Sequence, residues 1–230
     1  LLLYRENEKM YKIETHTHTS ETSPCSHINA TELITEYKKK GYSTVIITDH
    51  FIEKNFLGLS QSDVQSRFLK GFDTALSCGK ELGITVLLGA EIRFTNSKED
   101  YLVYGIDSDF VCTYYAIYKK DVRYLRNVLT MGREPFLIVQ AHPGRPGHEC
   151  KYPEYIDGIE VFNAMNNSED MNDRAKDYCK QFNKLPFSGT DCHKKEVLGV
   201  AGMNCNSPVT STRDFVEMVS NRQYELIHPL

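Results

Sequence analysis

Short apolar, β-branched runs alternate along the chain with longer segments whose apolar residues recur at helical spacing. Residues 44–48 and 84–88 are nearly continuous apolar runs, which are typical of strands buried on both faces. The other runs with strand character are 11–15, 101–106, 136–140, 158–162 and 185–188, with 199–203 and 224–227 as two weaker candidates. The pattern therefore predicts about seven principal strands.

Helices are predicted between several of these strands. In the segment 29–40, Asn29 is a candidate N-cap and Gly41 a candidate stop signal. The remaining helical segments are 61–82, which Gly83 is expected to end, 120–131, 168–183 and 212–220. Strands that alternate with helices indicate βαβ units and a parallel sheet. We expect one α/β domain, and a closed or distorted (β/α) barrel in preference to an open sheet.

Histidines and acidic residues gather where the predicted strands end. The residues that follow strands are His16, His18, Asp49, His50, Glu91, His142, Asp191 and His193, and Asp100 comes just before the strand at 101–106. In a barrel the carboxyl ends of the strands converge on one face, where such proteins place their active sites. The positions of these residues favour the barrel and predict one shared site.

The residue types at these positions favour a catalytic metal site. Two histidines two residues apart on an extended chain lie on the same side and can chelate one ion. Histidine and carboxylate ligands without a cysteine cluster suit Zn, Mn or Fe. Such an ion lowers the pKa of bound water to about 7 and so supplies hydroxide at neutral pH. Each motif alone is a weak signal, and their joint occurrence carries the prediction.

Composition narrows the possible partners and the compartment. The chain has 230 residues, a size that fits one domain, and a net charge of −4, which gives no basic footprint for nucleic acid. Its seven cysteines include no C-x-x-C pair, and an odd number disfavours a disulfide framework, so we expect a cytoplasmic protein. No apolar run approaches the length of a membrane span. Residues 1–10 are set apart as an N-terminal extension whose status the sequence leaves open.

Five motifs in order resemble those of the PHP (polymerase and histidinol phosphatase) family. They are His16-Thr17-His18-Thr19, Ile47-Thr48-Asp49-His50, Gly89-Ala90-Glu91, Ala141-His142-Pro143 and Asp191-Cys192-His193. The resemblance runs from about residue 12 to about residue 203. It implies a distorted seven-stranded (β/α) barrel, a trinuclear metal site and phosphoesterase activity, with 11–230 as a single PHP-type domain.

The same resemblance implies a ligand set for two or three divalent ions. One ion would take His16, His18, Glu91 and Asp191, and a second would share Glu91 and take His142. A third would take His50, His193 and a histidine downstream of the first motif, for which His27 is the candidate. Many members have a histidine where this chain has Asp100, and an aspartate there favours a harder metal such as Mn.

Cationic and polar residues near the motifs are candidates for contact with a substrate. Arg145, three residues after His142, can bind a phosphate oxygen with its planar guanidinium, and Arg93 is a weaker candidate of the same kind. Asn163 is a candidate for a substrate contact or for a position behind a ligand. Asp49 is expected to orient a ligand histidine or carry a proton, with a structural cap as the competing interpretation.

These features predict a hydrolase that acts on a small phosphate monoester through metal-bound hydroxide, with Arg145 neutralising charge. Histidinol phosphate is one candidate substrate, because Cys25-Ser26-His27 resembles a Cys-x-His of histidinol-phosphatase-like members. A nucleotide or a nucleic-acid end is an alternative, although the acidic charge disfavours long polymers. Amidohydrolase barrels, which usually place a lysine ligand at a strand end, and a non-catalytic metal-binding regulatory domain are the other possibilities. The sequence leaves the oligomeric state open.

Overall fold

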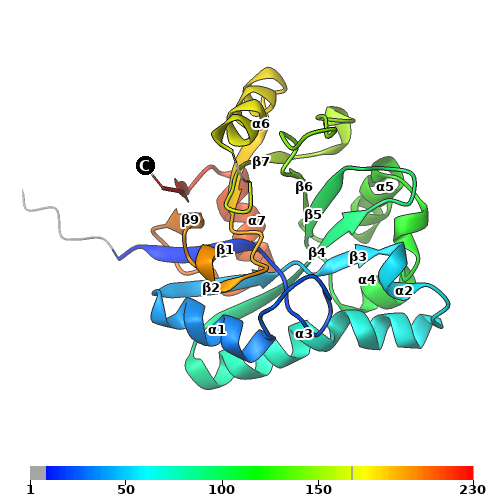
Figure 1. Cartoon of the computed structure of the whole chain (residues 1–230), viewed down its shortest axis with the longest axis horizontal. Coiled ribbons are helices and arrows are strands. Elements are labelled where there is room, and N and C mark those ends of the chain that lie inside the picture. The colour runs from blue at the N-terminus through cyan, green and yellow to red at the C-terminus, as the bar shows by residue number, and fades with distance from the viewer. Residues whose placement is uncertain (1–8, 167, 230) are drawn as a thin grey trace, which may run out of the picture.

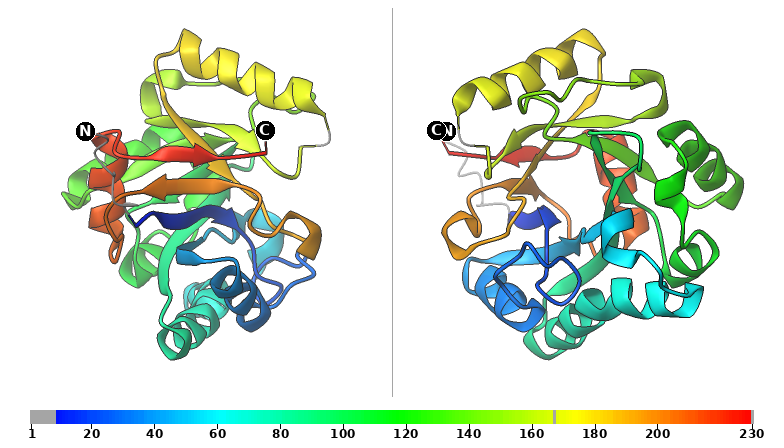
Figure 2. Two further views of the ribbon diagram at one scale, coloured as in Figure 1. Left: turned by 90° about the vertical axis from the view of Figure 1, so that its left-hand side faces the viewer. Right: turned by 45° about the vertical axis from the view of Figure 1, so that its right-hand side comes forward.

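The computed structural model describes residues 9–166 and 168–229, which fold around one twisted, nearly closed sheet (Figure 2). Its strands are β1 (Tyr11–Thr17), β2 (Tyr42–Ile47), β3 (His50–Ile52), β4 (Thr85–Arg93), β5 (Asp100–Tyr104), β6 (Leu137–Ala141), β7 (Gly158–Asn163), β8 (Leu185–Gly189), β9 (Gly202–Cys205) and β10 (Glu225–Ile227). Of the proposed extension 1–10, residues 1–8 lie outside the described part, and Lys9 and Met10 precede β1. No helix among the described residues has the length and apolar character to cross a membrane.

The helices pack outside this sheet (Figures 1 and 2). They are α1 (Ala30–Lys39), α2 (Glu53–Phe56), α3 (Gln61–Leu82), α4 (Ser108–Thr113), α5 (Val122–Gly132), α6 (Glu169–Gln181) and α7 (Thr212–Ser220), with short 3-10 helices at Ile117–Lys119, Pro153–Tyr155 and Lys195–Val197. Two predicted signals are confirmed: the Asn29 side chain caps α1 by accepting from the amide of Glu32, and Gly83 ends α3 with φ 64°. Local sequence therefore fixed the main helix boundaries to within a few residues.

The predicted parallel sheet is mixed in the structure, because β5 and β9 run antiparallel to their neighbours. The strand order is β10-β9-β1-β2-β4-β5-β6-β7-β8, with β3 beside β4. The β1–β2, β2–β4, β6–β7 and β7–β8 pairs are parallel, whereas β5 is antiparallel to both neighbours, as is β9. No helix separates β4 from β5, so the chain turns back directly and β5 runs in the opposite direction. The sequence also missed the short strand β3.

Hydrogen bonds between β1 and the segment formed by β8 and the residues after it bring the sheet close to a barrel. The Thr15 hydroxyl donates to the carbonyl of Ser188 (2.7 Å), and the amide of Asp191 donates to the carbonyl of His16 (2.8 Å). A parallel bridge joins Thr17, the last residue of β1, to Cys192 beyond the end of β8. The motifs at the two ends of the sequence therefore meet at one seam.

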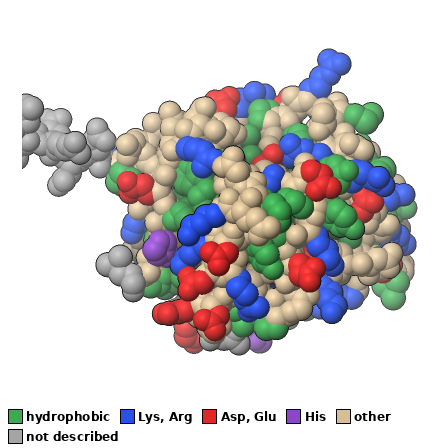
Figure 3. Space-filling model, turned by 90° about the horizontal axis from the view of Figure 1, so that it is seen from above, with side chains coloured by type: hydrophobic (Ala, Val, Ile, Leu, Met, Phe, Trp, Pro, Cys, Tyr) green, Lys and Arg blue, Asp and Glu red, His purple; other side chains and the backbone are tan. Residues whose placement is uncertain are grey.

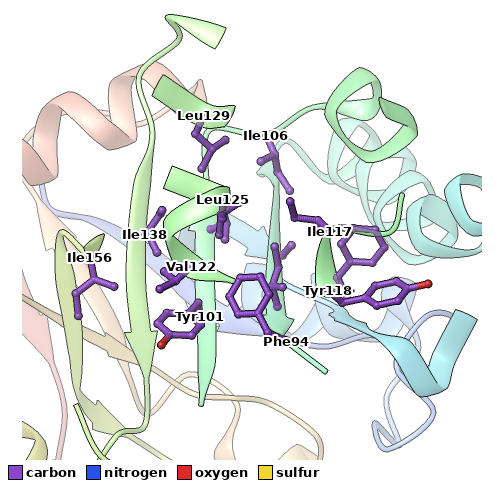
Figure 4. Packing of buried hydrophobic residues seen from close by; sticks show 14 of the residues in the cluster. Phe94, Tyr101, Ile106, Ile117, Tyr118, Val122, Leu125, Leu129, Ile138 and Ile156 are labelled. Atoms are coloured by element: carbon purple, nitrogen blue, oxygen red, sulfur yellow. The ribbon is translucent and has the colours of Figure 1, made fainter. Parts of the chain in front are cut away.

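Two apolar layers hold the sheet in place. Outside it, α5 and its neighbours bury a cluster that includes Tyr101, Val122, Leu125 and Ile138 (Figure 4). Inside the sheet, the inward-facing strand residues at one end of the barrel are apolar, such as Leu102 and Val139. Phe215 of α7 packs against this inner layer. On β4, Leu87 and Glu91 lie on the same inner face, because every second side chain of a strand points to the same side. The inner face thus changes from an apolar plug to ionisable residues along one strand.

Candidate metal centre

The predicted ligands converge at one end of the barrel, and three groups of their ligand atoms lie close enough to hold ions. The groups are His16–His18–Asp191, His16–Glu91–His142 and His18–His50–His193. Seven of the nine predicted metal ligands are therefore brought together, and the groups share His16 and His18. Sequence predicted this convergence from strand ends, and the barrel produces it because those ends meet on one face.

The first group has the dimensions of a tetrahedral site. The Nε2 atoms of His16 and His18 are 3.2 Å apart, and the Oδ1 atom of Asp191 is 3.1 Å from His18 Nε2 and 3.4 Å from His16 Nε2. Ligand atoms bound at about 2.0–2.2 Å to a tetrahedral ion lie about 3.3–3.6 Å apart. The three atoms are spaced like the corners of a coordination tetrahedron.

Glu91 connects this group to the histidines around it. Its Oε1 atom is 3.5 Å from His16 Nε2 and 2.9 Å from His142 Nε2. Its Oε2 atom is 3.5 Å from His18 Nε2 and 2.6 Å from His50 Nδ1. Because each oxygen of this one carboxylate faces a different pair of imidazoles, Glu91 has the contacts of a bridging ligand.

Asp100 reaches the same end of the barrel although it precedes its strand. Because β5 is antiparallel, Asp100 pairs with Arg93 of β4 and with Ala141 of β6. Its Oδ2 atom is 3.7 Å from His142 Nε2, and its carboxylate also accepts hydrogen bonds from the Nε (2.7 Å) and Nη2 (2.5 Å) atoms of Arg93. Its ligation stays a prediction, now with a structural reason for its position.

His27 and Cys25 differ from their expected arrangement. Among the described residues no ligand group includes His27, whose side chain is exposed and whose backbone amide donates to the carbonyl of His193 (2.9 Å). Cys25 belongs to none of these groups either, and it lines the pocket beside His193. Burial raises the pKa of Cys25, but the influence of His193 and His50 lowers it to about 6.

The carboxylate of Glu160, which sequence reasoning missed, lies directly behind the ligands. It accepts from Nδ1 of His16 at Oε1 (2.8 Å), and at Oε2 it accepts from the amide of His142 (3.0 Å) and from Nδ2 of Asn163 (2.8 Å). A carboxylate behind Nδ1 fixes the tautomer of a histidine and leaves Nε2 free to bind a metal. The only signal in the sequence was an acidic residue inside an otherwise apolar strand.

A second missed carboxylate, Glu14, ties the two motif-bearing strand ends together. It is fully buried and accepts from the amides of His16 (2.9 Å) and Thr190 (3.1 Å) and from the hydroxyl of Tyr37 (2.6 Å). Burial raises the pKa of Glu14 to about 7, although these hydrogen bonds oppose the shift. Glu14 therefore holds His16 and the residue before Asp191 at a fixed separation.

The electrostatics of the site favour bound cations. Burial alone would raise the pKa of Glu91, yet the nearby His50 and His16 hold it well below its usual value. Burial likewise lowers the pKa of His16, but the charges of Glu160, Asp191 and Glu91 raise it well above its usual value. Glu91 and Asp191, whose pKa values are both held low, therefore stay ionised and favour positive charge on His16, which divalent ions can supply in place of protons.

Buried polar atoms without hydrogen-bond partners are a second observation that fits bound metal ions. Nδ1 of His50 and Oε2 of Glu91 are buried and lie 2.6 Å apart, yet neither forms a hydrogen bond of acceptable geometry among the described residues. Unpaired buried polar atoms are rare in native proteins and call for a ligand or another explanation. Imidazole nitrogens and carboxylate oxygens are the donors that Zn, Mn and Fe accept.

Two of the predicted ligands occupy strained backbone conformations. His142 has φ 32° and Asp191 has φ 51°, in the left-handed region that side chains other than glycine rarely adopt. Each such residue costs about 1–3 kcal/mol and persists only where its surroundings hold it. Here the amide of His142 donates to Glu160 and that of Asp191 to the carbonyl of His16. The turns direct both side chains into the site.

The three predicted substrate-contacting residues lie at the rim of the site and are engaged with its acids. Arg145 donates from Nη2 to Oδ2 of Asp191 (2.6 Å) and to Oδ1 of Asn163 (3.1 Å). Arg93 is paired with Asp100, and its side chain is 41% exposed. Asn163 is buried and links Arg145 to Glu160. Their substrate contacts stay predictions, and the structure gives Asn163 a role in positioning Arg145.

Asp49, predicted as a catalytic residue, anchors the loop that follows His18. Its carboxylate accepts from the amide (2.8 Å) and hydroxyl (2.7 Å) of Thr19 and from the hydroxyl of Ser23 (2.7 Å). A Cβ at Gly71 of α3 would lie 1.9 Å from the Thr19 hydroxyl, so glycine allows the helix to approach this loop. Burial raises the pKa of Asp49 to about 6 against these hydrogen bonds. Proton transfer by Asp49 is untested, and its contacts favour the structural alternative.

A pocket of about 380 Å³ opens beside the ligands. It is lined by Cys25, His27, Arg145, Met165, Asp191, His193 and Lys194. The side chains of Arg145 and Lys194 thus place two positive charges at this opening, next to the first and third groups. Elsewhere, acidic and basic side chains are interspersed on the face shown in Figure 3, without a single extended basic patch there.

The fold and the site together are those of a metal-binding barrel protein: a nearly closed α/β barrel with histidines and carboxylates at its strand ends. The family is shown by sequence comparison: the PHP domain profile matches residues 14–185, and the PHP-associated C-terminal profile matches residues 169–224. The chain therefore belongs to the PHP domain family. None of the curated proteins is significantly similar to it in sequence.

Solved structures share the fold at low sequence identity. PsfC from Pseudomonas syringae is 17% identical, with a TM-score of 0.70 over 96% of this chain and 92% of its own. A two-domain protein from Bacteroides vulgatus, described as containing a predicted PHP-like metal-dependent phosphoesterase, is 15% identical, with a TM-score of 0.69 over 96% of this chain. This chain spans 65% of that protein. An amidohydrolase from Chromobacterium violaceum, solved with bound sulfate and no metal, is 14% identical, with a TM-score of 0.58 over 95% of this chain and 98% of its own.

Proposed function

We propose that this protein is a metal-dependent phosphoesterase that hydrolyses a small phosphate monoester at the barrel end. The observation that carries the proposal is the position of Glu91, whose two oxygens face four histidines in adjoining ligand groups. A carboxylate between neighbouring ions is the arrangement that phosphoryl-transfer sites with two metals use. When bound, the ions would lower the pKa of a water molecule and neutralise charge on the phosphate.

The residues of the chain would bind and orient the ester. Arg145 stands at the pocket with its guanidinium on Asp191, so a phosphate oxygen could reach Arg145 and the ligand group together. Asn163 fixes the guanidinium from behind, which reduces the conformational freedom lost on substrate binding. Lys194 adds a second positive charge to the pocket wall.

Several features favour a small substrate over a polymer. The pocket volume of about 380 Å³ fits a compact ligand. The net charge of −4 opposes attraction of a long polyanion. Histidinol phosphate and nucleotides are both members of the proposed substrate class, and the bound sulfate of the Chromobacterium violaceum amidohydrolase is a tetrahedral oxyanion of the same shape as phosphate.

The test is a hydrolysis screen with protein loaded separately with Zn, Mn or Fe. The panel should hold phosphate monoesters, including histidinol phosphate and nucleotides, together with phosphodiesters, amides and lactones. We expect phosphate release that His16→Ala abolishes together with metal binding at the first group. Hydrolysis of amides or lactones alone would refute the phosphoesterase proposal, and a fully metallated protein without activity on any ester would do the same.

A further inference from the structure

Helix α6 lies behind the arginine to which the proposed function gives the phosphate contact. We propose that Asn172 of α6 is a positioning residue for Arg145, and that it acts through two asparagines of the loop after β7. These are Asn163 and Asn166, whose side chains bind the guanidinium. The inference rests on the proposed function and adds the buried residue that prepares Arg145 for an anionic oxygen of the substrate.

Three oxygen atoms hold the guanidinium of Arg145 in one orientation. Its Nε atom donates to Oδ1 of Asn166 (2.9 Å). Its Nη2 atom donates to Oδ1 of Asn163 (3.1 Å) and to Oδ2 of Asp191 (2.6 Å). A guanidinium has donors and no acceptor, so both asparagines must present their oxygen to it and not their NH₂ group.

Each of these two asparagines is turned the right way by a bond at the other end of its amide. Nδ2 of Asn163 donates to Oε2 of Glu160 (2.8 Å), and Nδ2 of Asn166 donates to Oδ1 of Asn172 (2.7 Å). Because a side-chain amide carries oxygen at one end and NH₂ at the other, fixing the NH₂ group directs the oxygen to the opposite side. Asn172 therefore does for Asn166 what Glu160 does for Asn163.

The same oxygen of Asn172 also fixes the backbone at the end of β7. It accepts from the amide of Asn163 (3.1 Å) in addition to Nδ2 of Asn166. Asn172 is only 8% exposed, so water does not readily replace this acceptor. One buried oxygen thus sets both asparagines that hold the guanidinium.

The loop that carries Arg145 packs against the same part of α6. A Cβ at Gly144 would lie 1.8 Å from the carbonyl oxygen of Met171, the residue before Asn172, so the loop can approach the helix this closely only with glycine. The carbonyl of Arg145 also accepts from the amide of His148 (3.0 Å) within this loop. The backbone of Arg145 and the partners of its side chain are therefore both placed by one stretch of α6.

A guanidinium that is oriented before the substrate arrives loses less conformational freedom on binding. Asn172 should therefore affect the affinity for phosphate and leave the metal content unchanged, since none of the metal-ligand groups among the described residues includes it. A residue that only stabilised the fold would not change phosphate affinity through Arg145 in particular.

The first experiment observes Arg145 directly in the metal-free protein. Proton–nitrogen NMR records the Nε–H signal of Arg145, which Arg145→Ala identifies by its absence, and its exchange with water. The variants are Asn172→Ala, which removes the acceptor, and Asn172→Asp, which keeps it. Both hydrogen bonds of the Asn172 side chain among the described residues end on Oδ1, so aspartate preserves them. Asn55→Ala is the matched control, because Asn55 is also helical and 8% exposed.

The second experiment measures the binding of inorganic phosphate to Mn-loaded protein by calorimetry, with elemental analysis of the metal. Asn172→Ala is compared with the wild type, and the double variant Asn172→Ala with Arg145→Ala is compared with Arg145→Ala alone. Such a cycle isolates the effect that Asn172 exerts through Arg145. Circular dichroism verifies that each variant is folded.

We expect Asn172→Ala to weaken phosphate binding about fivefold, the effect of roughly one lost hydrogen bond, at unchanged metal content. In the Arg145→Ala background the same change should have almost no effect. The Nε–H signal of Arg145 should shift and exchange faster in Asn172→Ala, and should stay as in the wild type in Asn172→Asp and Asn55→Ala.

An unchanged Arg145 signal in folded Asn172→Ala would overturn the proposal. So would an equal loss of phosphate affinity with and without the arginine. Neither measurement requires hydrolysis, so a protein that binds phosphate but cleaves no ester in the substrate screen would refute the proposed function and not the role of Asn172.

Discussion

Replacing Glu160 by glutamine should weaken metal binding without removing a single metal ligand. The carboxylate of Glu160 is fully buried and receives three hydrogen bonds, from His16, His142 and Asn163. Glutamine offers an acceptor at one end only. If its oxygen serves His142 and Asn163, its NH₂ group faces Nδ1 of His16. The imidazole must then carry its proton on Nε2, where the ion binds.

The size of the effect follows from this change of tautomer. Loss of a hydrogen-bonded partner behind a ligand typically costs 10–100-fold in metal affinity, or about 1.4–2.7 kcal/mol. Competition with a coloured chelator measures the affinity of the tightest site for Zn or Mn. Nitrogen chemical shifts of the His16 ring report its tautomer in the metal-free protein.

Asp157→Asn is the matched control for Glu160→Gln. It also replaces a carboxylate by an amide, but Asp157 precedes β7 at the opposite end of the strand from the site, where it pairs with Arg126. We expect this variant to bind metal like the wild type. If Glu160→Gln bound metal as tightly as the wild type, with His16 in its original tautomer, the assigned role of Glu160 would be wrong.

Three further predictions concern the substrate, the ions and pH. Arg145→Lys should raise KM for phosphate monoesters about tenfold at unchanged metal content, because a lysine cannot replace the planar two-point contact; an unchanged KM in steady-state assays would count against it. Chelation should lower Tm in calorimetry and added Zn or Mn should restore it, since an ion at about 100 times its Kd stabilises the fold by about 2.7 kcal/mol; an identical Tm would contradict a metal centre in the folded state. Because burial raises the pKa of Glu14 from 4.5 to about 7, the folded metal-free protein keeps a proton that the unfolded chain has released. The free energy of unfolding should therefore fall as pH rises between about 4.5 and about 7, by about 3 kcal/mol at most. Urea titrations across this range should show a flatter pH dependence for Glu14→Gln, and an equal slope in both proteins would refute the shift.

The sequence by itself determined the elements and most of the candidate ligands. Apolar periodicity and end signals such as Asn29 and Gly83 are local, so they predicted the main helices closely. Ligands such as His16 and Glu91 follow strands directly, and any barrel brings strand ends together. Convergence of these residues therefore needed no knowledge of the exact strand order.

The tertiary structure decided which other groups reach the centre. Asp100 is there because β5 runs antiparallel, and Glu160 because the inner face of β7 lies behind His16. The His27 side chain is outside the ligand groups and exposed, although its backbone amide donates to the carbonyl of His193. Each depends on contacts between segments far apart in the chain. Periodicity along a sequence shows which face a residue occupies within its own element, but only folding determines what that face meets.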